Sequence, residues 1–320
     1  MSSISLTIKE KAIESGFDLV GISKAWIPAI DKENIEYWVK NKLYGKMDWF
    51  PKNQNLRLYF ENIGFSSVSA IVVASFYLDK EYYDVFKRFS FRLSRYAVGK
   101  DYHKILRQKA KGLLSYLKTT FPNQKFRQSV DTLPISEKVL AREAGIGWMG
   151  KNTNIIHPKK GSYFFLSVVL TDLPLEYDDP MKDRCGSCRA CMDACPTRAL
   201  YEPYKIDAGR CISHHTIEDK SLEFSQDAKL ALSSWIYGCD ICQEVCPFNK
   251  VASKNQNNLT KRKEFHVKDY FHNTLETDFL SLNQKEFEEF VRDSAMNRIS
   301  YLQFKRNVDA YYHWKKTSHR

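Results

Sequence analysis

The sequence has no hydrophobic run long enough to cross a bilayer. Its longest apolar stretches, at residues 70–77 and 163–170, are far shorter than the roughly 20 residues of a membrane-spanning helix. The N-terminus lacks the apolar core and small-residue cleavage site of a secretory signal, and residues 4–14 have the spacing of an amphipathic helix. We therefore expect a cytoplasmic protein without a membrane partner, in which thiols stay reduced.

Familiar catalytic patterns are also missing. Neither G-x-S-x-G nor H-E-x-x-H occurs. Residues 145–150 (GIGWMG) match G-x-G-x-x-G, but a helix is expected before them, where a dinucleotide site needs a strand. We interpret them as a glycine-rich helix exit that lets another group approach the backbone. Residues 101–106 (DYHKIL) match the corrinoid motif D-x-H-x-x-G except that Leu106 replaces the glycine, so His103 is expected to be solvated or capping and not a cobalt ligand.

The composition is that of a globular protein. With 320 residues, of which 43% are hydrophobic and 27% charged, the chain can bury a core without disulfides, and its length suggests about two domains. Residues 1–180 are predicted to be mixed α/β. Buried strands are expected at 68–78 and 163–170, and helices at 102–117 and 134–144.

Positive charge is in excess, because 49 Lys and Arg stand against 38 Asp and Glu for a net charge of +11. This favours an acidic partner such as nucleic acid. Basic residues gather at 88–111, where aromatic residues are interleaved with them, and again at 261–268. Such a surface can bind phosphates and stack on unpaired bases, although solvated helix faces explain each cluster equally well. The candidate contacts to nucleic acid are Lys100, Lys104, Lys261, Arg262 and Lys263.

The cysteines are crowded into one part of the chain. All eight lie within residues 185–246, and the first 184 residues contain none. In a reducing compartment, such crowding points to metal. Residues 185–196 follow C-x2-C-x2-C-x3-C-P, the run of bacterial two-cluster ferredoxins, in which the fourth cysteine binds the other cluster. Residues 239–247 follow C-x2-C-x3-C-P and lack one cysteine of that run.

The remaining cysteine, Cys211, completes the ligands of two [4Fe–4S] clusters. Cluster one is predicted to take Cys185, Cys188, Cys191 and Cys246. Cluster two is predicted to take Cys195, Cys211, Cys239 and Cys242. The alternative is a pair of four-cysteine zinc sites, but these normally use two separated C-x2-C pairs and not a triple followed by C-P. The clusters imply transfer of single electrons at low potential.

Three regions are therefore expected: an α/β (α+β) domain at 1–180, a ferredoxin-like module with two clusters at 181–250, and a short helical region at 251–320. Residues 252–263 are polar and are predicted to be a linker or an exposed loop. Helical spacing in the last region comes from Phe287, Phe290, Val291, Phe304, Val308, Tyr311 and Tyr312.

Asp131 lies in residues 130–134 (VDTLP), between an expected strand end and the helix at 134–144. From this position alone, it is expected to cap the helix or to be favoured by the helix dipole. Nothing in its local sequence assigns it a chemical role.

Taken together, several segments resemble the epoxyqueuosine reductases, cobalamin-dependent iron–sulfur enzymes of queuosine synthesis in tRNA. The matching N-terminal segments are residues 16–21, 94–97, 101–104, 130–134 and 137–138. The later ones are residues 144–152, both cysteine runs, and residues 211–213, 216–218 and 237–240. The resemblance covers nearly the whole chain. Some members carry an added helical-repeat domain, and this chain is expected to stop before it.

The resemblance implies an activity: two-electron removal of the epoxide oxygen from epoxyqueuosine at the wobble position of tRNA, which gives queuosine. Cobalamin would bind in the N-terminal domain beside the ferredoxin-like module. Asp131 matches the family's proposed proton donor, and an acid is needed because the oxygen otherwise leaves as an alkoxide. A partly desolvated carboxyl there can keep its proton near neutral pH. The candidate corrin contacts are Arg57, Tyr96, Asp131, Asn152 and Ser213.

Two other functions stay open from the sequence. One is a corrinoid iron–sulfur reductase of the reductive dehalogenase type, which acts on small molecules and has no use for a basic surface. The other is a non-enzymatic dicluster electron carrier in which residues 1–180 form a docking module. For the preferred function we expect a tRNA carrying epoxyqueuosine and an external electron donor as partners, and a monomeric protein.

Overall fold

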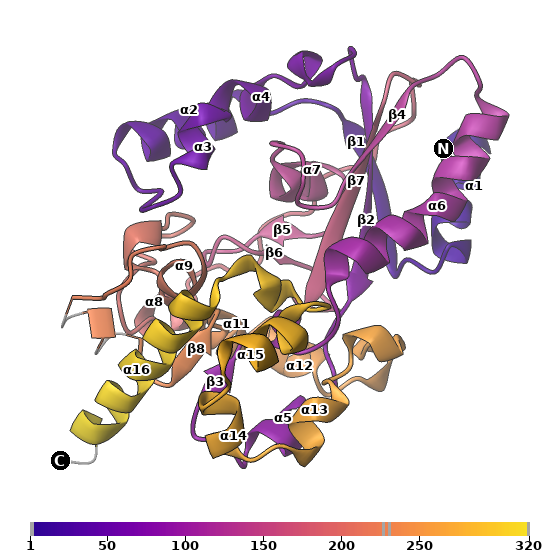
Figure 1. Ribbon diagram of the computed structural model, residues 1–320. Helices are drawn as coiled ribbons and strands as arrows, with labels where there is room; N and C mark the ends of the chain where they lie inside the picture. The colour runs from indigo at the N-terminus through magenta and orange to yellow at the C-terminus, as the bar shows by residue number, and fades with distance from the viewer. Residues whose placement is uncertain (1–2, 226–227, 230–231, 319–320) are drawn as a thin grey trace.

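The computed structural model describes residues 3–225, 228–229 and 232–318. At its centre lies a four-stranded sheet with the order β1-β2-β7-β4 (Figure 1), in which every neighbouring pair is antiparallel. Its strands are β1 (Leu19–Lys24), β2 (Ser69–Phe76), β4 (Phe126–Ser129) and β7 (Phe164–Thr171). The mixed α/β prediction is confirmed, and the antiparallel pairing makes the domain α+β. None of the described helices is both long and apolar enough to pass through a membrane.

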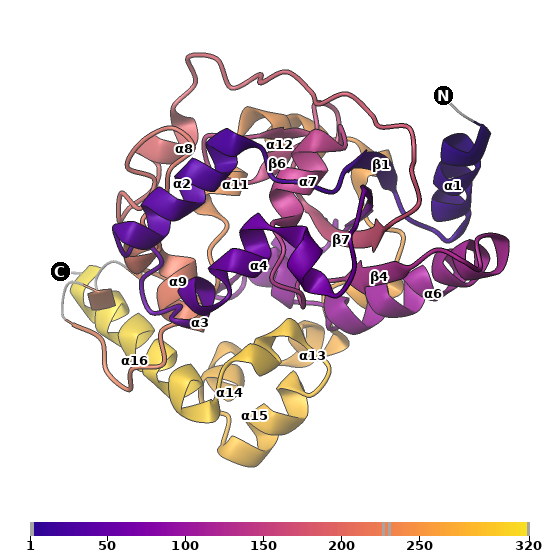
Figure 2. The ribbon, with the colours of Figure 1, turned by 90° about the horizontal axis from the view of Figure 1, so that it is seen from above.

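Helices cover both faces of the sheet, as the two views show (Figures 1 and 2). They are α1 (Ser3–Glu14) and α6 (Tyr102–Thr120) on one face and α7 (Glu137–Glu143) on the other. Ile71 and Val73 pack on the α1/α6 side, whereas Val72 and Ala74 pack on the α7 side. Successive side chains of a strand point to opposite faces, and helices cover both faces here, so all of β2 is buried, which explains the apolar run at residues 70–74.

A helical segment between β1 and β2 reaches toward the cysteine region. It consists of α2 (Ala29–Lys40), α3 (Trp49–Lys52), α4 (Gln54–Leu58) and the 3₁₀ turn η1 (Phe60–Ile63). The indole Nε1 of Trp38 donates to the Ile206 carbonyl at 2.7 Å, and the Ala208 N–H donates to the Leu43 carbonyl at 2.8 Å. These bonds fix the segment against the chain between the two cysteine runs.

The glycine-rich segment at 145–150 leads from α7 into a short hairpin. Its strands are β5 (Trp148–Met149) and β6 (Ile155–Ile156). A Cβ on Gly147 would lie 2.4 Å from the backbone carbonyl oxygen of Ile156, so glycine is required there for the two strands to approach. The interpretation as a helix exit with close backbone approach is confirmed, because α7 precedes the motif and the β5–β6 hairpin follows it.

The cysteine region contains short elements that position the thiols. They are α8 (Ala190–Asp193), η3 (Ala208–Arg210), α9 (Ile212–Ile217), β8 (Trp235–Tyr237), α11 (Ile241–Glu244) and α12 (Pro247–Ala252). Pro247 is the first residue of α12, directly after Cys246, where its missing N–H leaves no helical hydrogen bond unmade. The second C-P step therefore starts a helix.

The C-terminal region is helical, as predicted. Its elements are η4 (Gln256–Asn258), η5 (Lys263–Phe265), α13 (Asp269–Asn273), α14 (Glu276–Leu280), α15 (Gln284–Val291), η6 (Ala295–Arg298) and α16 (Tyr301–Ser318). They share an aromatic core with α5 (Tyr82–Phe86), β3 (Arg92–Leu93) and η2 (Arg95–Ala97). This core joins residues from all three predicted regions, whose boundaries stay a prediction. Phe89 and Phe91 are buried in it, so they are not exposed stacking residues of a basic surface.

The polar segment at 252–263 is anchored to the rest of the fold. Asn258 and Thr260 are buried, and the Thr260 N–H donates to the Leu78 carbonyl at 2.8 Å. The Asn258 amide donates to the carbonyls of Lys159 and Ala252 at 2.8 and 3.0 Å. The prediction of a linker or exposed loop is therefore only half right, because some of the polar side chains supply the bonds that hold the segment down.

Candidate active site

Asp131 lies in the loop between β4 and α7, with its backbone in the left-handed region at φ +51°. Its N–H donates to Glu137 Oε1 at 2.9 Å, and the Ser129 hydroxyl donates to the same oxygen at 2.7 Å. These bonds hold the loop on the first turn of α7. The N-cap residue of that helix is Ser136, so the interpretation of Asp131 as a cap is wrong.

The carboxylate of Asp131 instead contacts the start of α6. The Tyr102 hydroxyl donates to Asp131 Oδ2 at 3.0 Å, and His103 Nε2 lies 3.7 Å from the same oxygen. The other ring nitrogen of His103, Nδ1, lies 2.8 Å from Asp101 Oδ1, which also caps α6 by accepting from the His103 N–H at 3.0 Å. His103 therefore sits between two carboxylates and is not merely solvated or capping.

These contacts determine the protonation states of His103, Asp131 and Glu137. Burial by itself lowers the pKa of His103, but its hydrogen bonds to Asp101 and Asp131 outweigh burial and raise it to about 9. Burial by itself raises the pKa of Asp131, but the bonds from His103 and Tyr102 bring it below its usual range. Burial and the Asp131 charge raise the pKa of Glu137 to about 7. In the free site Asp131 is therefore ionised at neutral pH, which corrects the expectation that it keeps its own proton.

Cations face Asp131 from other elements. Arg57 of α4, Lys138 of α7 and Arg298 of η6 each interact electrostatically with its carboxylate. Arg298 is held in place by an ion pair to Glu218 at 2.9 Å. The Asp131 side chain is 71% exposed, yet the surrounding protein is dense enough to desolvate it. Solvent and ligands can therefore reach the carboxylate, and we call its surroundings, with Arg57, Lys138 and Arg298, the Asp131 recess.

The four other candidate corrin contacts are divided between this recess and cluster two. Arg57 lies against the rings of Trp49 and Phe50, and its Nε is buried without a hydrogen-bond partner among the described residues. Such an atom suits a ligand that offers hydrogen-bond acceptors, as the amide side chains of a corrin do. Tyr96 is half-buried and packs edge-on against Tyr102.

Asn152 and Ser213 lie beside the ligands of cluster two. Asn152 is 3% exposed, and its amide donates to the Cys242 carbonyl at 3.2 Å. Ser213 is half-buried in α9, two residues after Cys211. Asn152 therefore positions a cluster loop, and the corrin contacts of both residues stay a prediction.

The predicted ligands of cluster one surround one cavity. Its lining includes Cys185, Cys188, Cys191 and Cys246. The indole Nε1 of Trp148 donates to the sulfur of Cys185 at 3.4 Å. Burial raises the pKa of the Cys191 thiol to about 11, so its thiolate needs a metal to stabilise it. Four thiols around a cavity provide the donor set of an iron–sulfur cluster.

The predicted ligands of cluster two are also neighbours. Cys242 interacts electrostatically with Cys195, Cys211 and Cys191, and Cys239 interacts with Cys211 and Cys242. The electrostatic interaction of Cys242 with Cys191 indicates that the two groups are near each other. Lys138 interacts with Cys211, Cys242 and also Asp131. Cluster two therefore lies on the side of the Asp131 recess.

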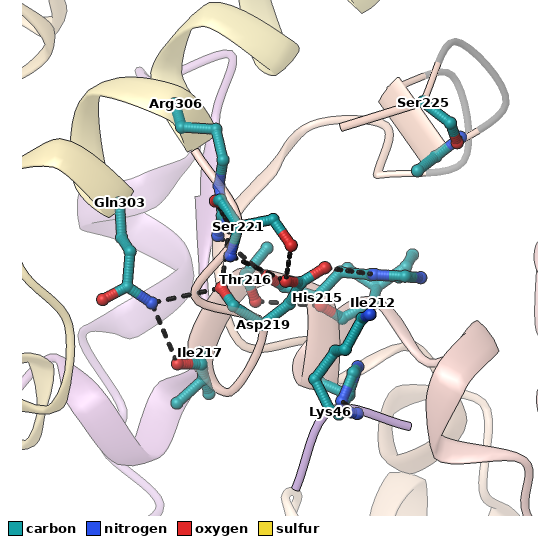
Figure 3. Close-up of polar contacts among 12 residues, drawn as sticks. Lys46, Ile212, His215, Thr216, Ile217, Asp219, Ser221, Ser225, Gln303 and Arg306 are labelled. Carbon is teal, nitrogen blue, oxygen red and sulfur yellow. Dashed lines mark hydrogen bonds and ion pairs between the residues drawn. The ribbon is translucent and has the colours of Figure 1, made fainter. Parts of the chain in front are cut away.

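The C-terminal helix α16 fixes the chain near two of these ligands, and Figure 3 shows its Arg306 beside His215, Asp219 and Ser221. Arg306 donates to the carbonyls of His215 and Asp219 at 3.0 and 2.7 Å, and also to that of Ser221. Asn307 donates to the carbonyls of Thr216 in α9 and Ile236 in β8, both at 2.9 Å. Because α9 follows Cys211 and β8 precedes Cys239, one helix holds both ligand segments.

A buried ion pair joins two segments that the family resemblance had singled out. The Arg95 guanidinium lies 3.1 Å from Asp240 and 2.7 Å from Glu244, and the side chains of Arg95 and Asp240 are each 1% exposed. Asp240 lies between Cys239 and Cys242, and Asp240 also accepts from the Ser94 hydroxyl. The pair therefore positions a loop that carries two ligands of cluster two.

The structure brings parts of the two basic clusters together. The Lys100 N–H donates to the Glu264 carbonyl at 2.7 Å, so Lys100 lies beside η5, which begins at Lys263. Lys104 is exposed one residue after His103, and Lys261 is exposed as well. Arg262 is half-buried and reaches toward Gly16 and Lys109. The exposed lysines can therefore contribute to one surface near the recess.

Sequence reasoning missed the partners of Asp131. Tyr102, His103, Glu137 and Lys138 lie in segments that carried the resemblance, but no spacing rule connects them to residue 131. No feature of the sequence indicated that Arg298 lies near Asp131. These residues meet only because α6, α7 and η6 pack around one loop.

Two family models match the chain. One is described as "4Fe-4S double cluster binding domain" and matches residues 184–249. The other is described as "Epoxyqueuosine reductase QueG, DUF1730" and matches residues 57–132. The first covers all eight cysteines and supports the predicted clusters over the zinc alternative.

Full-length relatives give the same family. The epoxyqueuosine reductase of Prochlorococcus marinus (strain NATL2A) is 35% identical over 318 residues, 97% of this chain and 98% of that protein. The Escherichia coli (strain K12) enzyme is 33% identical over 311 residues, 96% of this chain and 80% of that protein.

Solved structures that resemble this chain are also epoxyqueuosine reductases. An epoxyqueuosine reductase with an epoxyqueuosine-modified tRNA-Tyr stem loop has a TM-score of 0.82 at 28% identity, covering 98% of this chain and 82% of that one. The Bacillus subtilis enzyme, with an aspartate-bearing catalytic loop swung out of the active site, has a TM-score of 0.83 at 27% identity and the same coverage. With relatives above 30% identity along nearly its whole length, the chain belongs to the epoxyqueuosine reductase family of oxidoreductases, and neither alternative function is retained.

Proposed function

We propose that this protein reduces epoxyqueuosine to queuosine at the wobble position of tRNA, with Asp131 as the donor of a proton to the epoxide oxygen. The observation that carries the proposal is the recess around Asp131, where side chains from α4, α6, α7 and η6 converge. Lys138 connects that recess to two ligands of cluster two. The proposed acid and the cluster that would deliver electrons therefore lie on the same side of the protein.

Cobalamin is the proposed cofactor of the recess, and the unpartnered Nε of Arg57 is the atom that supports its binding there. When bound, cobalamin supplies a metal centre that accepts single electrons and delivers a pair to the substrate. The chain contributes the remaining functions. Tyr102 orients Asp131 Oδ2 through its hydroxyl, and Glu137 holds the loop through the Asp131 N–H.

The two clusters are proposed to carry electrons inward from an external donor. Cys188 is the one predicted ligand that is exposed, and it belongs to cluster one. Cluster two is expected to lie nearer Asp131, because Lys138 interacts electrostatically with Cys211, Cys242 and Asp131. We expect a donor in the cytoplasm to approach cluster one of a monomeric enzyme.

The tRNA is proposed to bind across the exposed lysines near the recess. The wobble base lies in a single-stranded loop, where a base can be splayed into a pocket at modest cost. Lys104 is next to His103 in α6, and Lys100 lies beside η5. A related structure contains an epoxyqueuosine-modified tRNA stem loop. This supports the proposal that the anticodon loop of tRNA binds to this protein as well.

Asp131→Asn tests the proposal, because it keeps the size of the side chain and removes the acid. We expect turnover of epoxyqueuosine-containing tRNA to fall by about 10²–10⁴-fold. Cluster absorbance, cobalamin absorbance and tRNA affinity should not change. Asp84→Asn is the matched control, since Asp84 is exposed on α5 and pairs only with Lys87 among the described residues. Near-normal turnover by Asp131→Asn would remove Asp131 from the mechanism.

A further inference from the structure

The proposed reaction needs more protons than Asp131 can carry. Converting an epoxide to an alkene and water breaks both carbon–oxygen bonds, forms one carbon–carbon π bond, and consumes two electrons and two protons. The electrons come from the external one-electron donor through the clusters. A carboxylic acid delivers one proton at a time, so Asp131 must be reprotonated within each turnover. It must also be loaded before the first transfer, because it is ionised in the free site.

The geometry around Asp131 points to the source of these protons. We propose that His103 passes protons to Asp131 from its Nε2 atom, and that Asp101 positions the imidazole by accepting a hydrogen bond from Nδ1. This inference rests on the proposed function and adds a proton-relay residue to it. The relevant separations are 3.7 Å from Nε2 to Asp131 Oδ2 and 2.8 Å from Nδ1 to Asp101 Oδ1.

The arrangement fixes which ring nitrogen faces the acid. Asp101 also accepts from the His103 backbone N–H, so the carboxylate and the imidazole are held by the same helix turn. The His103 ring is stacked on Tyr102, with centroids 4.0 Å apart, and Tyr102 donates to the same Asp131 oxygen that faces Nε2. A shift of about 1 Å from 3.7 Å would close a hydrogen bond of ordinary length.

His103 can also be reloaded. Its side chain is 28% exposed, so its ring exchanges protons with solvent, whereas Asp131 would be covered once substrate and cofactor occupy the recess. After each transfer the neutral ring keeps Nδ1–H on Asp101 and takes the next proton at Nε2. The relay therefore links bulk water to the acid without water reaching the epoxide.

The charges that face His103 keep its proton in place at neutral pH. Asp101 and Asp131 favour the imidazolium, and Glu137 lies behind Asp131 on α7. Cations oppose them: Lys104 lies on the same helix, while Lys138 and Arg298 act through Asp131. The carboxylates prevail, and the pKa of His103 is about 9. The proton is present at pH 7 and is lost as the pH rises through 9.

His103→Gln is the direct test, because glutamine can still donate a hydrogen bond but cannot relay a proton. We expect kcat to fall by about 10–100-fold with little change in KM for tRNA. The alkaline decline near pH 9 should disappear, and added imidazole should restore part of the rate. Cluster absorbance and the thermal midpoint should stay at wild-type values. His272→Gln is the matched control, since His272 lies on α13 and its Nε2 is 3.6 Å from Glu81.

A titration that does not depend on activity completes the test. The His103 ring should titrate near 9 by NMR in the oxidised protein without cobalamin, and Asp131→Asn should move that value down toward 6.5. A His103→Gln enzyme with wild-type kcat and an intact alkaline limb overturns the relay, even if Asp131→Asn is inactive. A wild-type enzyme that does not turn over epoxyqueuosine overturns the proposed function itself.

Discussion

The two cysteine groups have similar sequence runs but different surroundings. Cluster one is bounded by its own run, by Cys246 and by the β5–β6 hairpin, and its Cys188 is exposed. Cluster two is held from outside the cysteine runs, by Arg95 from β3–η2 and by α16 from the far end of the chain. The run determines the ligands, while the rest of the fold determines how rigidly and how deeply they are held. The more deeply held cluster is the one beside Asp131.

Arg95→Met is expected to have the largest effect on the stability of cluster two relative to cluster one. It leaves Asp240 and Glu244 without their buried cation, and breaking a buried pair in this way costs about 3–5 kcal/mol. We expect loss of cluster two, measured as iron content and EPR signal, before loss of cluster one. The double variant Arg95→Met/Asp240→Asn is the control and should recover part of the stability. Equal loss of both clusters would contradict the comparison.

A smaller effect is expected from Asn307→Leu in α16. The change removes two hydrogen bonds to the carbonyls of Thr216 and Ile236, and leaving such groups unpaired costs about 1–3 kcal/mol. The free energy of unfolding from an anaerobic urea titration should fall by that amount, with earlier loss of the cluster-two signal. Asp309→Leu, on the exposed side of the same helix, should have little effect. If Asn307→Leu and Asp309→Leu lowered the free energy of unfolding equally, the two Asn307 hydrogen bonds would not be what holds α9 and β8 in place.

The smallest effect is expected at the surface beside cluster one. Arg189→Gln breaks an exposed ion pair to Asp193, whose members are 59% and 65% exposed, and such pairs contribute about 0–1 kcal/mol. The free energy of unfolding and the iron content should remain at wild-type values. A marked loss of cluster one would show that its surroundings are as constrained as those of cluster two.

The main elements and the presence of two clusters could be predicted because their signals are local, while the grouping of the eight cysteines stays a prediction. The spacing of a cysteine run limits which thiols can reach one cluster, and the apolar run of β2 shows burial on both faces. The role of His103 could not be predicted in this way. Its environment depends on Asp131, 28 positions later in the chain, and the local sequence predicted only a solvated or capping histidine.

The sequence alone determined the family, the eight candidate ligands and the mixed α/β architecture, since these are encoded in short patterns and their combination. The tertiary structure alone decided that Asp131 is ionised, that His103 lies between Asp131 and Asp101, and that Arg95 pairs with Asp240. The physical reason is that a proton or a buried charge responds to every group within a few ångströms. Packing of distant segments, and not spacing along the chain, determines which groups those are.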